Sequence, residues 1–221
     1  MTHTPVLGSL PRQFHIELNG RTHAVESGRT ILQVCKEAHI EIPVFCAHPR
    51  LPVAGNCRMC LVEVQGNHKL VASCHTEVQE GMVINTQSPR VQEARAGTLE
   101  LLLVNHPLDC PVCDKGGMCD LQDLTMEYGY DHSRFHEHKR AVSEKYMGPL
   151  IQTVMTRCIH CTRCVRFATE VAGVEDLGAL GRGELLEITT YLEGAMTSEL
   201  SSNVIDLCPV GALNAKPFQY Q

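Results

Sequence analysis

The chain has 221 residues and a formal net charge of −6, from 19 Lys and Arg against 25 Asp and Glu. This balance argues against a nucleic-acid-binding protein. Hydrophobic residues make up 43% of the sequence and charged residues 20%, which is close to the globular average, so the chain can form a core. Its 12 cysteines are unusual, because a core of this size does not need so many thiols.

The start of the chain and its longest apolar stretch predict where the protein works. Residues 1–5 provide neither the basic nor the apolar region of an export signal. In a reducing compartment, many cysteines indicate metal ligation or redox chemistry rather than disulfides. The apolar stretch Leu99–Val104 is interrupted by Glu100 and is too short to cross a bilayer. We therefore expect a cytoplasmic chain with no direct membrane span, which can dock on a membrane complex.

The first segment shows the pattern of a small sheet with one helix. Apolar residues alternate from Phe14 to Leu18, and the turn signal Asn19-Gly20 follows before a second strand over 22–25. Thr30 and Gln33 fit a capping box for a helix that reaches about residue 39 and buries Cys35 as a core thiol. Further strands are expected over 61–64, 69–72 and 82–84. Residues 1–86 are therefore predicted to form a β-grasp domain.

A helical segment follows. Ser88 supplies an N-cap and Pro89 an N1 proline for a helix that runs to Val104. Its buried face is expected to hold Val91, Ala94, Leu99 and Leu102. A loop over 108–119 and a short helix after Asp120 complete a small helical domain over 87–127.

The last segment, residues 128–221, is predicted to be a ferredoxin-like domain. Residues 128–148 are polar and indicate a surface connection. A strand near 150–155 and a helix after Cys164 should follow. We expect the segments after residue 86 to have little hydrophobic core of their own, so that bound metal supports their folding. The fold class predicted for the whole chain is α+β.

The first set of cysteines has the pattern C-x10-C-x2-C-x13-C and lies in the predicted β-grasp domain. Gly55, just before the central C-x2-C, lets the backbone pass close to a cluster, where N–H groups can bond to sulfide. This favours a [2Fe–2S] centre, although the first loop is longer than in plant-type ferredoxins. A zinc site is the alternative. The set consists of Cys46, Cys57, Cys60 and Cys74.

The second set offers three thiolates, from Cys110, Cys113 and Cys119. A four-iron cluster needs a fourth ligand, and His106 lies four residues upstream of Cys110. Three cysteines and one histidine also suit zinc, so the residues alone leave iron and zinc open. If the centre is a [4Fe–4S] cluster, the neutral imidazole removes one negative charge and by itself raises the reduction potential.

The third set has the compact spacing C-x2-C-x2-C, from Cys158, Cys161 and Cys164. In bacterial two-cluster ferredoxins this run continues to a fourth cysteine that serves another cluster. Ala168 occupies that position here, and a remote Cys208-Pro209 supplies the missing Cys-Pro signature. The spacing therefore predicts one [4Fe–4S] cluster, and zinc fits it less well because zinc sites pair two separated C-x2-C hairpins.

Other features are less specific. Four arginines flank the candidate ligands and either offset cluster charge or form a solvated positive face: Arg58, Arg157, Arg163 and Arg166. Gly181-Arg182-Gly183 lacks the third glycine of a dinucleotide fingerprint. We expect no flavin or nucleotide on this chain, and no catalytic residue, because no nucleophile with a partnered base is visible.

Four motifs together resemble a known family: residues 54–63, 105–114, 156–167 and 205–212. They are similar to the N-terminal cluster-binding part of the G-subunit family of bacterial NADH:quinone oxidoreductase, respiratory complex I. The resemblance implies iron rather than zinc at the second set. It implies one [2Fe–2S] cluster at Cys46, Cys57, Cys60 and Cys74, a mixed-ligand [4Fe–4S] cluster at His106, Cys110, Cys113 and Cys119, and an all-cysteine [4Fe–4S] cluster at Cys158, Cys161, Cys164 and Cys208.

The same resemblance implies a function. The chain would be an electron-relay subunit of a translocase, receiving electrons from the flavin-bearing, NADH-oxidising subunit and passing them through a ferredoxin-like subunit toward the quinone. It would lie on the cytoplasmic face of the inner membrane as a peripheral part of the complex. One alternative is the diaphorase subunit of an NAD-linked hydrogenase or formate dehydrogenase. A zinc-binding structural scaffold is the alternative of another class.

Overall fold

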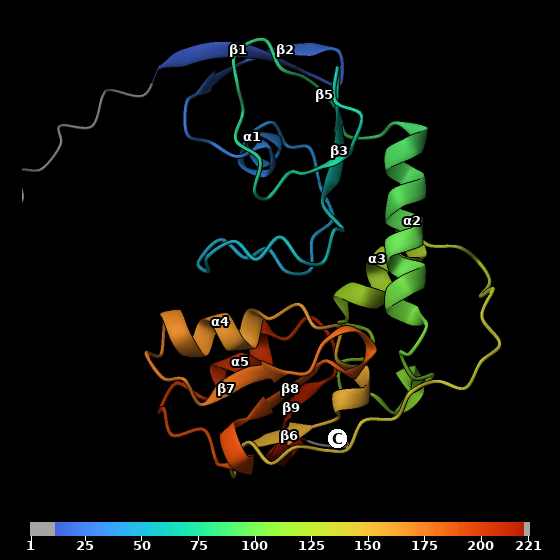
Figure 1. The fold of residues 1–221 in the computed structure, drawn as a ribbon, viewed down its shortest axis with the longest axis vertical. Coiled ribbons are helices and arrows are strands. Elements are labelled where there is room, and N and C mark those ends of the chain that lie inside the picture. Colours follow the sequence, from blue (N-terminus) through green and yellow to red (C-terminus); the bar gives the residue numbers. More distant parts are fainter. Residues whose placement is uncertain (1–11, 219–221) are drawn as a thin grey trace, which may run out of the picture. The chain divides into compact units, whose positions relative to one another are not determined.

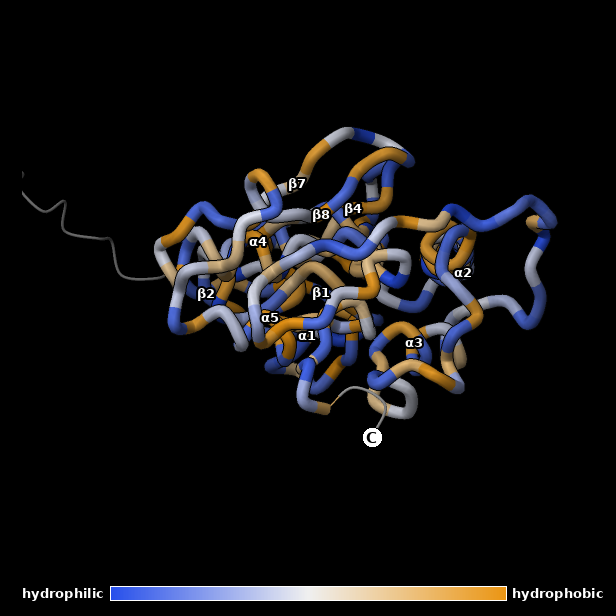
Figure 2. Tube along the Cα trace, turned by 90° about the horizontal axis from the view of Figure 1, so that it is seen from below, coloured by the Kyte–Doolittle hydropathy of each residue, from blue (hydrophilic) through white to orange (hydrophobic). Residues whose placement is uncertain are grey.

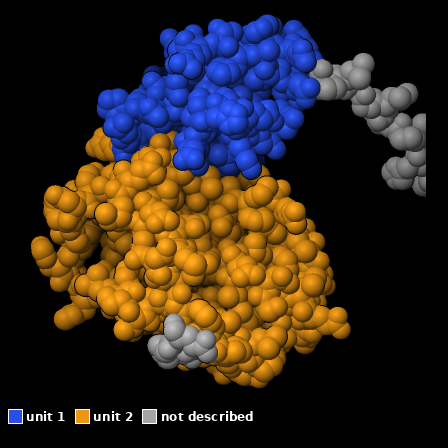
Figure 3. Space-filling model, turned by 180° about the vertical axis from the view of Figure 1, so that it is seen from behind, with its two compact units in different colours: residues 1–42, 60–92 blue, residues 43–59, 93–221 orange. Residues whose placement is uncertain are grey.

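The computed structural model describes residues 12–218, and the chain divides into two compact units (Figure 3). The first unit holds residues 1–42 and 60–92, and the second holds residues 43–59 and 93–221. Small sheets and short helices alternate along the chain (Figure 1). The fold class is α+β, as expected from the sequence. The predicted domain boundaries at 86 and 127 stay a prediction.

In the first unit, the described strands form one sheet in the order β2-β1-β5-β3-β4. Strands β1 (Gln13–Leu18) and β2 (Arg21–Glu26) are antiparallel. Their turn places Asn19 and Gly20 at φ 51° and 80°, as a two-residue type I′ hairpin requires. Strand β5 (Val83–Asn85) runs parallel to β1 and antiparallel to β3 (Leu61–Val64). Strand β4 (Val71–Ala72) pairs with β3 and starts two residues later than predicted.

Helix α1 (Ile31–Glu37) belongs to the same unit and confirms the predicted capping box. The Gln33 N–H donates to Thr30 Oγ1 over 3.3 Å, and the Thr30 N–H donates to Gln33 Oε1 over 2.9 Å. Cys35 is fully buried on this helix, which confirms its assignment as a core thiol. The mixed sheet and its helix form the β-grasp arrangement expected from the sequence.

Helix α2 (Pro89–Leu103) begins after Ser88, whose Oγ accepts a hydrogen bond from the Val91 N–H over 3.4 Å. The predicted buried face is only partly correct, because Ala94 and Leu102 are partly exposed. Arg95 is buried instead. Its guanidinium carbon lies 5.4 Å from the centre of the Tyr128 ring, a cation–π contact that turns this face of the helix inward.

The second unit contains the remaining regular elements. Strands β6 and β9 form one antiparallel pair, and β7 and β8 form another. The β7–β8 hairpin was not predicted from the sequence. The bounds are α3 (Asp120–Tyr128), β6 (Ile151–Thr153), α4 (Arg163–Glu170), β7 (Leu177–Leu180), β8 (Glu187–Thr190), α5 (Asn203–Leu207) and β9 (Leu213–Ala215), with 3-10 turns at Cys110–Val112, Met155–Arg157, Gly183–Leu185, Tyr191–Glu193 and Lys216–Phe218.

The second unit has a substantial hydrophobic core, so the expectation of little core after residue 86 is wrong. Buried side chains from distant segments meet in one cluster that includes Phe45, Leu99, Ile151 and Ile188. The connection that follows α3 is mostly exposed and hydrophilic (Figure 2). It ends where Met147 is buried. Across residues 12–218, no helix combines the length and the hydropathy needed to span a membrane.

Candidate metal centres

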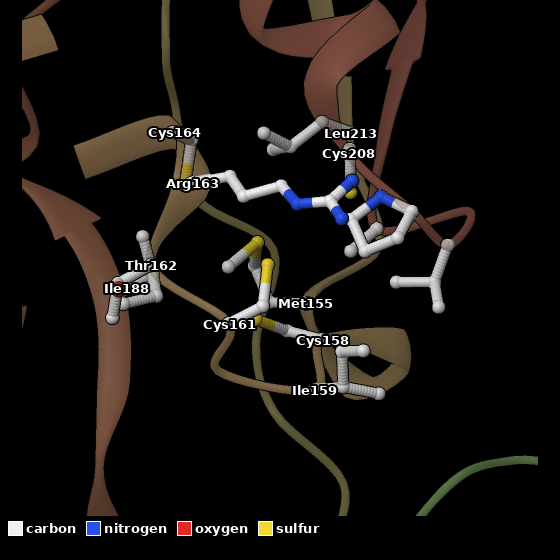
Figure 4. Close-up of a pocket in the computed structure, with 13 residues that line it drawn as sticks. Met155, Cys158, Ile159, Cys161, Thr162, Arg163, Cys164, Ile188, Cys208 and Leu213 are labelled. Atoms are coloured by element: carbon white, nitrogen blue, oxygen red, sulfur yellow. The ribbon is translucent and has the colours of Figure 1, made fainter. Parts of the chain in front are cut away.

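The all-cysteine set converges on one pocket in the second unit (Figure 4). Cys158 and Cys161 precede α4, Cys164 lies within it, and Cys208 follows α5. The loop between the first three cysteines can wrap around one point because His160 and Thr162 adopt φ values of 53° and 60°. The remote Cys208 therefore joins the compact triple, as the Cys-Pro signature predicted.

Burial makes these four thiols unusual. It raises the pKa of Cys158 to about 12 and that of Cys161 to about 11, and it also raises the pKa values of Cys164 and Cys208. Such thiols stay protonated at neutral pH unless a metal replaces the proton. The His160 N–H lies 3.4 Å from Cys158 Sγ and can donate to a bound sulfur. Four thiols outside any disulfide, two of them buried and two partly buried, line one pocket and are a donor set that suits a [4Fe–4S] cluster.

The mixed set lines a different cavity, of about 220 Å³. His106 follows α2, Cys110 begins a 3-10 turn, Cys113 follows that turn, and Cys119 is the N-cap of α3. All four side chains border this cavity. Cys110 is exposed, whereas Cys119 is buried and burial raises its pKa. The structure therefore brings His106 to the three thiols that lacked a fourth partner.

The His106 ring has the properties that suit a metal ligand. Its Nδ1 is buried and has no hydrogen-bond partner within residues 12–218. Burial is the main cause that lowers the pKa of His106 to about 4, so the imidazole is neutral at pH 7, the form that binds metals. An unpartnered buried nitrogen costs free energy, and a bound iron atom would remove that cost.

Gly211 makes room for the mixed set, and sequence reasoning missed it. A Cβ atom at this position would stand 2.2 Å from Cys113 Sγ. Only glycine allows the backbone to come so close to that sulfur. The available signal was a glycine three residues after Cys208, which the sequence analysis did not use.

The first set is partly assembled within each unit. In the second unit, the Cys46 N–H donates to Cys57 Sγ over 3.4 Å. A side-chain hydrogen bond with the Cys46 thiol is the main cause that raises the pKa of Cys57, whereas the backbone N–H bond lowers it. In the first unit, the Ser73 N–H donates to the Cys60 carbonyl over 3.1 Å, which brings Cys74 near Cys60. Ligation of one centre by all four cysteines stays a prediction.

Two arginines of α4 hold the segment that carries Cys46. Arg163 Nη2 donates to the Ala47 carbonyl over 2.9 Å. Arg166 Nη2 donates to the Cys46 carbonyl over 2.6 Å and to the Cys161 carbonyl over 3.3 Å. Arg166 thus joins the backbone of two candidate ligands from different sets.

A single metal ion needs ligands that converge on one point. Within the part of the chain that the structure describes, no three His, Cys, Asp or Glu side chains converge closely enough to hold one metal ion. A [4Fe–4S] cluster binds its ligands through different iron atoms, so its ligands surround a cavity rather than a point.

Three family models match successive parts of the chain. A 2Fe-2S iron-sulfur cluster binding domain matches residues 11–89. The NADH-ubiquinone oxidoreductase-G iron-sulfur binding region matches residues 95–134. The ferredoxin-like domain of NADH-quinone oxidoreductase subunit 3 matches residues 148–214. The chain therefore carries one [2Fe–2S] domain and two [4Fe–4S] domains.

Curated relatives carry the same domains. The chain is 63% identical over 206 residues to the NADH-ubiquinone oxidoreductase 75 kDa subunit of Reclinomonas americana. The match covers 93% of this chain and 30% of the relative. The chain is 56% identical to the G subunit of NADH-quinone oxidoreductase from Rickettsia felis, with 93% of this chain and 31% of the relative covered. The chain belongs to the G-subunit family of NADH-quinone oxidoreductase. It spans about 30% of the length of these G-subunit relatives.

A solved structure is also similar to this chain. It is titled as an NAD+-reducing [NiFe]-hydrogenase in the H2-reduced state. The match has a TM-score of 0.82 and 30% sequence identity, and it covers 92% of this chain and 87% of the other. The cluster-bearing fold is thus shared by the G-subunit family and a chain of a hydrogenase.

Proposed function

We propose that this chain is an iron–sulfur electron relay. One observation carries the proposal: in the second unit, four candidate ligands line one cavity, four others line a second cavity, and the segment 208–213 borders both. Two centres whose cavities border the same backbone segment would exchange electrons without a mobile carrier. No bond-making chemistry on a substrate is assigned to this chain, and neither a flavin nor a nucleotide.

The proposed ligands are the residues that the cavities and the spacing indicate. The all-cysteine [4Fe–4S] cluster would be held by four thiolates, and the mixed [4Fe–4S] cluster by three thiolates and a neutral imidazole. Sequence spacing and the match to a 2Fe-2S cluster binding domain over residues 11–89 support the [2Fe–2S] assignment. In order, the sets are Cys158, Cys161, Cys164 and Cys208; His106, Cys110, Cys113 and Cys119; and Cys46, Cys57, Cys60 and Cys74.

The names of the relatives support a place in NADH-quinone oxidoreductase. In this proposal the chain accepts electrons from the flavin-bearing, NADH-binding subunit and passes them to a ferredoxin-like subunit on the way to the quinone. It lies in the peripheral arm of the complex, on the cytoplasmic face of the inner membrane.

A diaphorase subunit of an NAD-linked hydrogenase is the second candidate, supported by the structural match to the NAD+-reducing hydrogenase. The higher identity to the G-subunit relatives favours the first candidate. A chromosomally tagged chain, isolated with its native partners, separates the two. NADH-dependent quinone reduction supports the first candidate, and H2-dependent reduction of NAD+ supports the second.

Metal analysis of the anaerobically purified chain tests the relay itself. The proposal expects about ten iron atoms per chain, a similar amount of acid-labile sulfide and little zinc. Low-temperature EPR at graded reduction should show one binuclear and two tetranuclear signals. A folded chain that contains zinc and almost no iron would instead identify the structural scaffold considered from the sequence.

A further inference from the structure

The two tetranuclear cavities share a wall made of two short segments. Along 208–213, Cys208 and Ala212 border the all-cysteine cavity, whereas Gly211 borders the mixed cavity. Along 155–159, Cys158 borders the first cavity and Arg157 the second. Neighbouring residues within the same backbone segment therefore border different cavities.

Arg157 brings a buried positive charge to the mixed cavity. The residue is only 6% exposed. Its Nε and Nη2 atoms lie 3.1 Å and 3.0 Å from Asp109 Oδ2, and its Nη1 donates to the Gly211 carbonyl over 3.5 Å. Its charge lowers the pKa of His106, whereas Asp109 raises it. Both residues of this ion pair line the mixed cavity.

Arg163 brings a positive charge to the all-cysteine cavity, as Arg157 does to the mixed cavity. It borders that cavity (Figure 4), and its side chain is 11% exposed. Asp120, its acidic neighbour, is farther away, with 3.9 Å between Nη1 and Oδ2. The Arg163 charge lowers the pKa of Cys161 against the larger effect of burial. These two arginines are therefore not part of a solvated positive face.

Resting on the proposed relay function, we propose that Arg157 and Arg163 are positioning residues that set the two tetranuclear reduction potentials separately. Each reduction adds one electron to a centre and makes or breaks no bond. A fixed cation beside the centre stabilises the added negative charge, and the effect is strong where water is excluded. Arg157 favours reduction of the mixed centre and Arg163 favours reduction of the all-cysteine centre. Asp109 offsets the effect of Arg157.

Potentiometric EPR on the full chain tests this assignment with paired variants. At a fixed applied potential, Arg157→Gln should lower the reduced-to-oxidised ratio of the mixed centre at least about tenfold, equivalent to about 59 mV for a one-electron couple. The all-cysteine ratio should change less than about threefold, equivalent to about 28 mV. Arg163→Gln should give the reverse pattern. Arg182→Gln, at an exposed arginine that borders neither cavity, is the control.

Two further variants separate charge from structure. Arg157→Lys keeps the charge and should recover more than half of the shift. Asp109→Asn should raise the potential of the mixed centre, which is the opposite of the effect of Arg157→Gln. If the Arg157→Gln chain does not bind the mixed cluster, Asp109→Asn tests whether this ion pair sets the potential. Equal shifts of both centres in each variant, or a fall in Asp109→Asn, would overturn the assignment. A wild-type chain with no tetranuclear signal would refute the relay function itself.

Discussion

The substitution Gly211→Ala tests the mixed centre most directly. The added Cβ would stand 2.2 Å from Cys113 Sγ, whereas non-bonded heavy atoms settle at about 3.5–4.0 Å. The sulfur would have to retreat by about 1.3 Å or more. Metal–ligand distances vary by only about 0.2 Å around their usual values. Cys113 therefore cannot remain a ligand in its present position, and the mixed cluster should be lost.

Iron analysis and EPR of the anaerobically purified variant measure this effect. Iron should fall from about ten to about six atoms per chain, with the mixed-centre signal lost and the other two signals kept. Gly178→Ala is a matched control, because Gly178 lies in the same unit and has open space where its Cβ would be. A Gly211→Ala chain with full iron content and both tetranuclear signals at wild-type potentials would refute the reasoning.

Three further predictions concern single cysteine or histidine residues. Cys208→Ala should remove only the all-cysteine signal, and loss of the binuclear signal alone would contradict the ligand grouping. Cys35→Ala changes a buried thiol of the β-grasp core and is the control. It should keep all signals and lower the free energy of unfolding in denaturant by about 1 kcal/mol. His106→Cys should keep a cluster and lower its potential by about 59 mV or more in a redox titration, because it adds a thiolate charge; an unchanged potential would argue against His106. Because burial lowers the pKa of His106 to about 4, protons should not compete with the metal for its ring between pH 7 and about 5. The EPR amplitude of the mixed centre should therefore stay constant over that range. A loss of amplitude centred near the ordinary histidine pKa of about 6.5 would contradict this.

Local signals in the sequence were sufficient for several elements. The Asn19-Gly20 turn and the Thr30 capping box depend on residues within three positions of one another, so their geometry follows from the sequence directly. The cysteines of the compact triple line one pocket for the same reason, since they lie within seven residues. Cys208 was found because the Cys-Pro signature indicates its role.

Other features depend on contacts between distant segments, which a single sequence does not reveal. The buried face of α2 was misjudged because Arg95 packs on Tyr128, a residue of another helix. Gly211 was missed because its neighbour, Cys113, belongs to a different ligand set. Whether Arg157 and Arg163 belong to a solvated positive face depends on the burial of their side chains, which the sequence does not reveal.

The path of the chain through its two units affects the order in which it can fold during synthesis. The polypeptide leaves the first unit after Ile42 and returns to it at Cys60. The segment between them is held by Arg163 and Arg166, through hydrogen bonds that join residues 116 and 120 positions apart. On the ribosome, the loop with Cys46 and Cys57 must wait until α4 has emerged. An isolated N-terminal fragment would keep the four cysteines of the first set but lack the anchor for two of them.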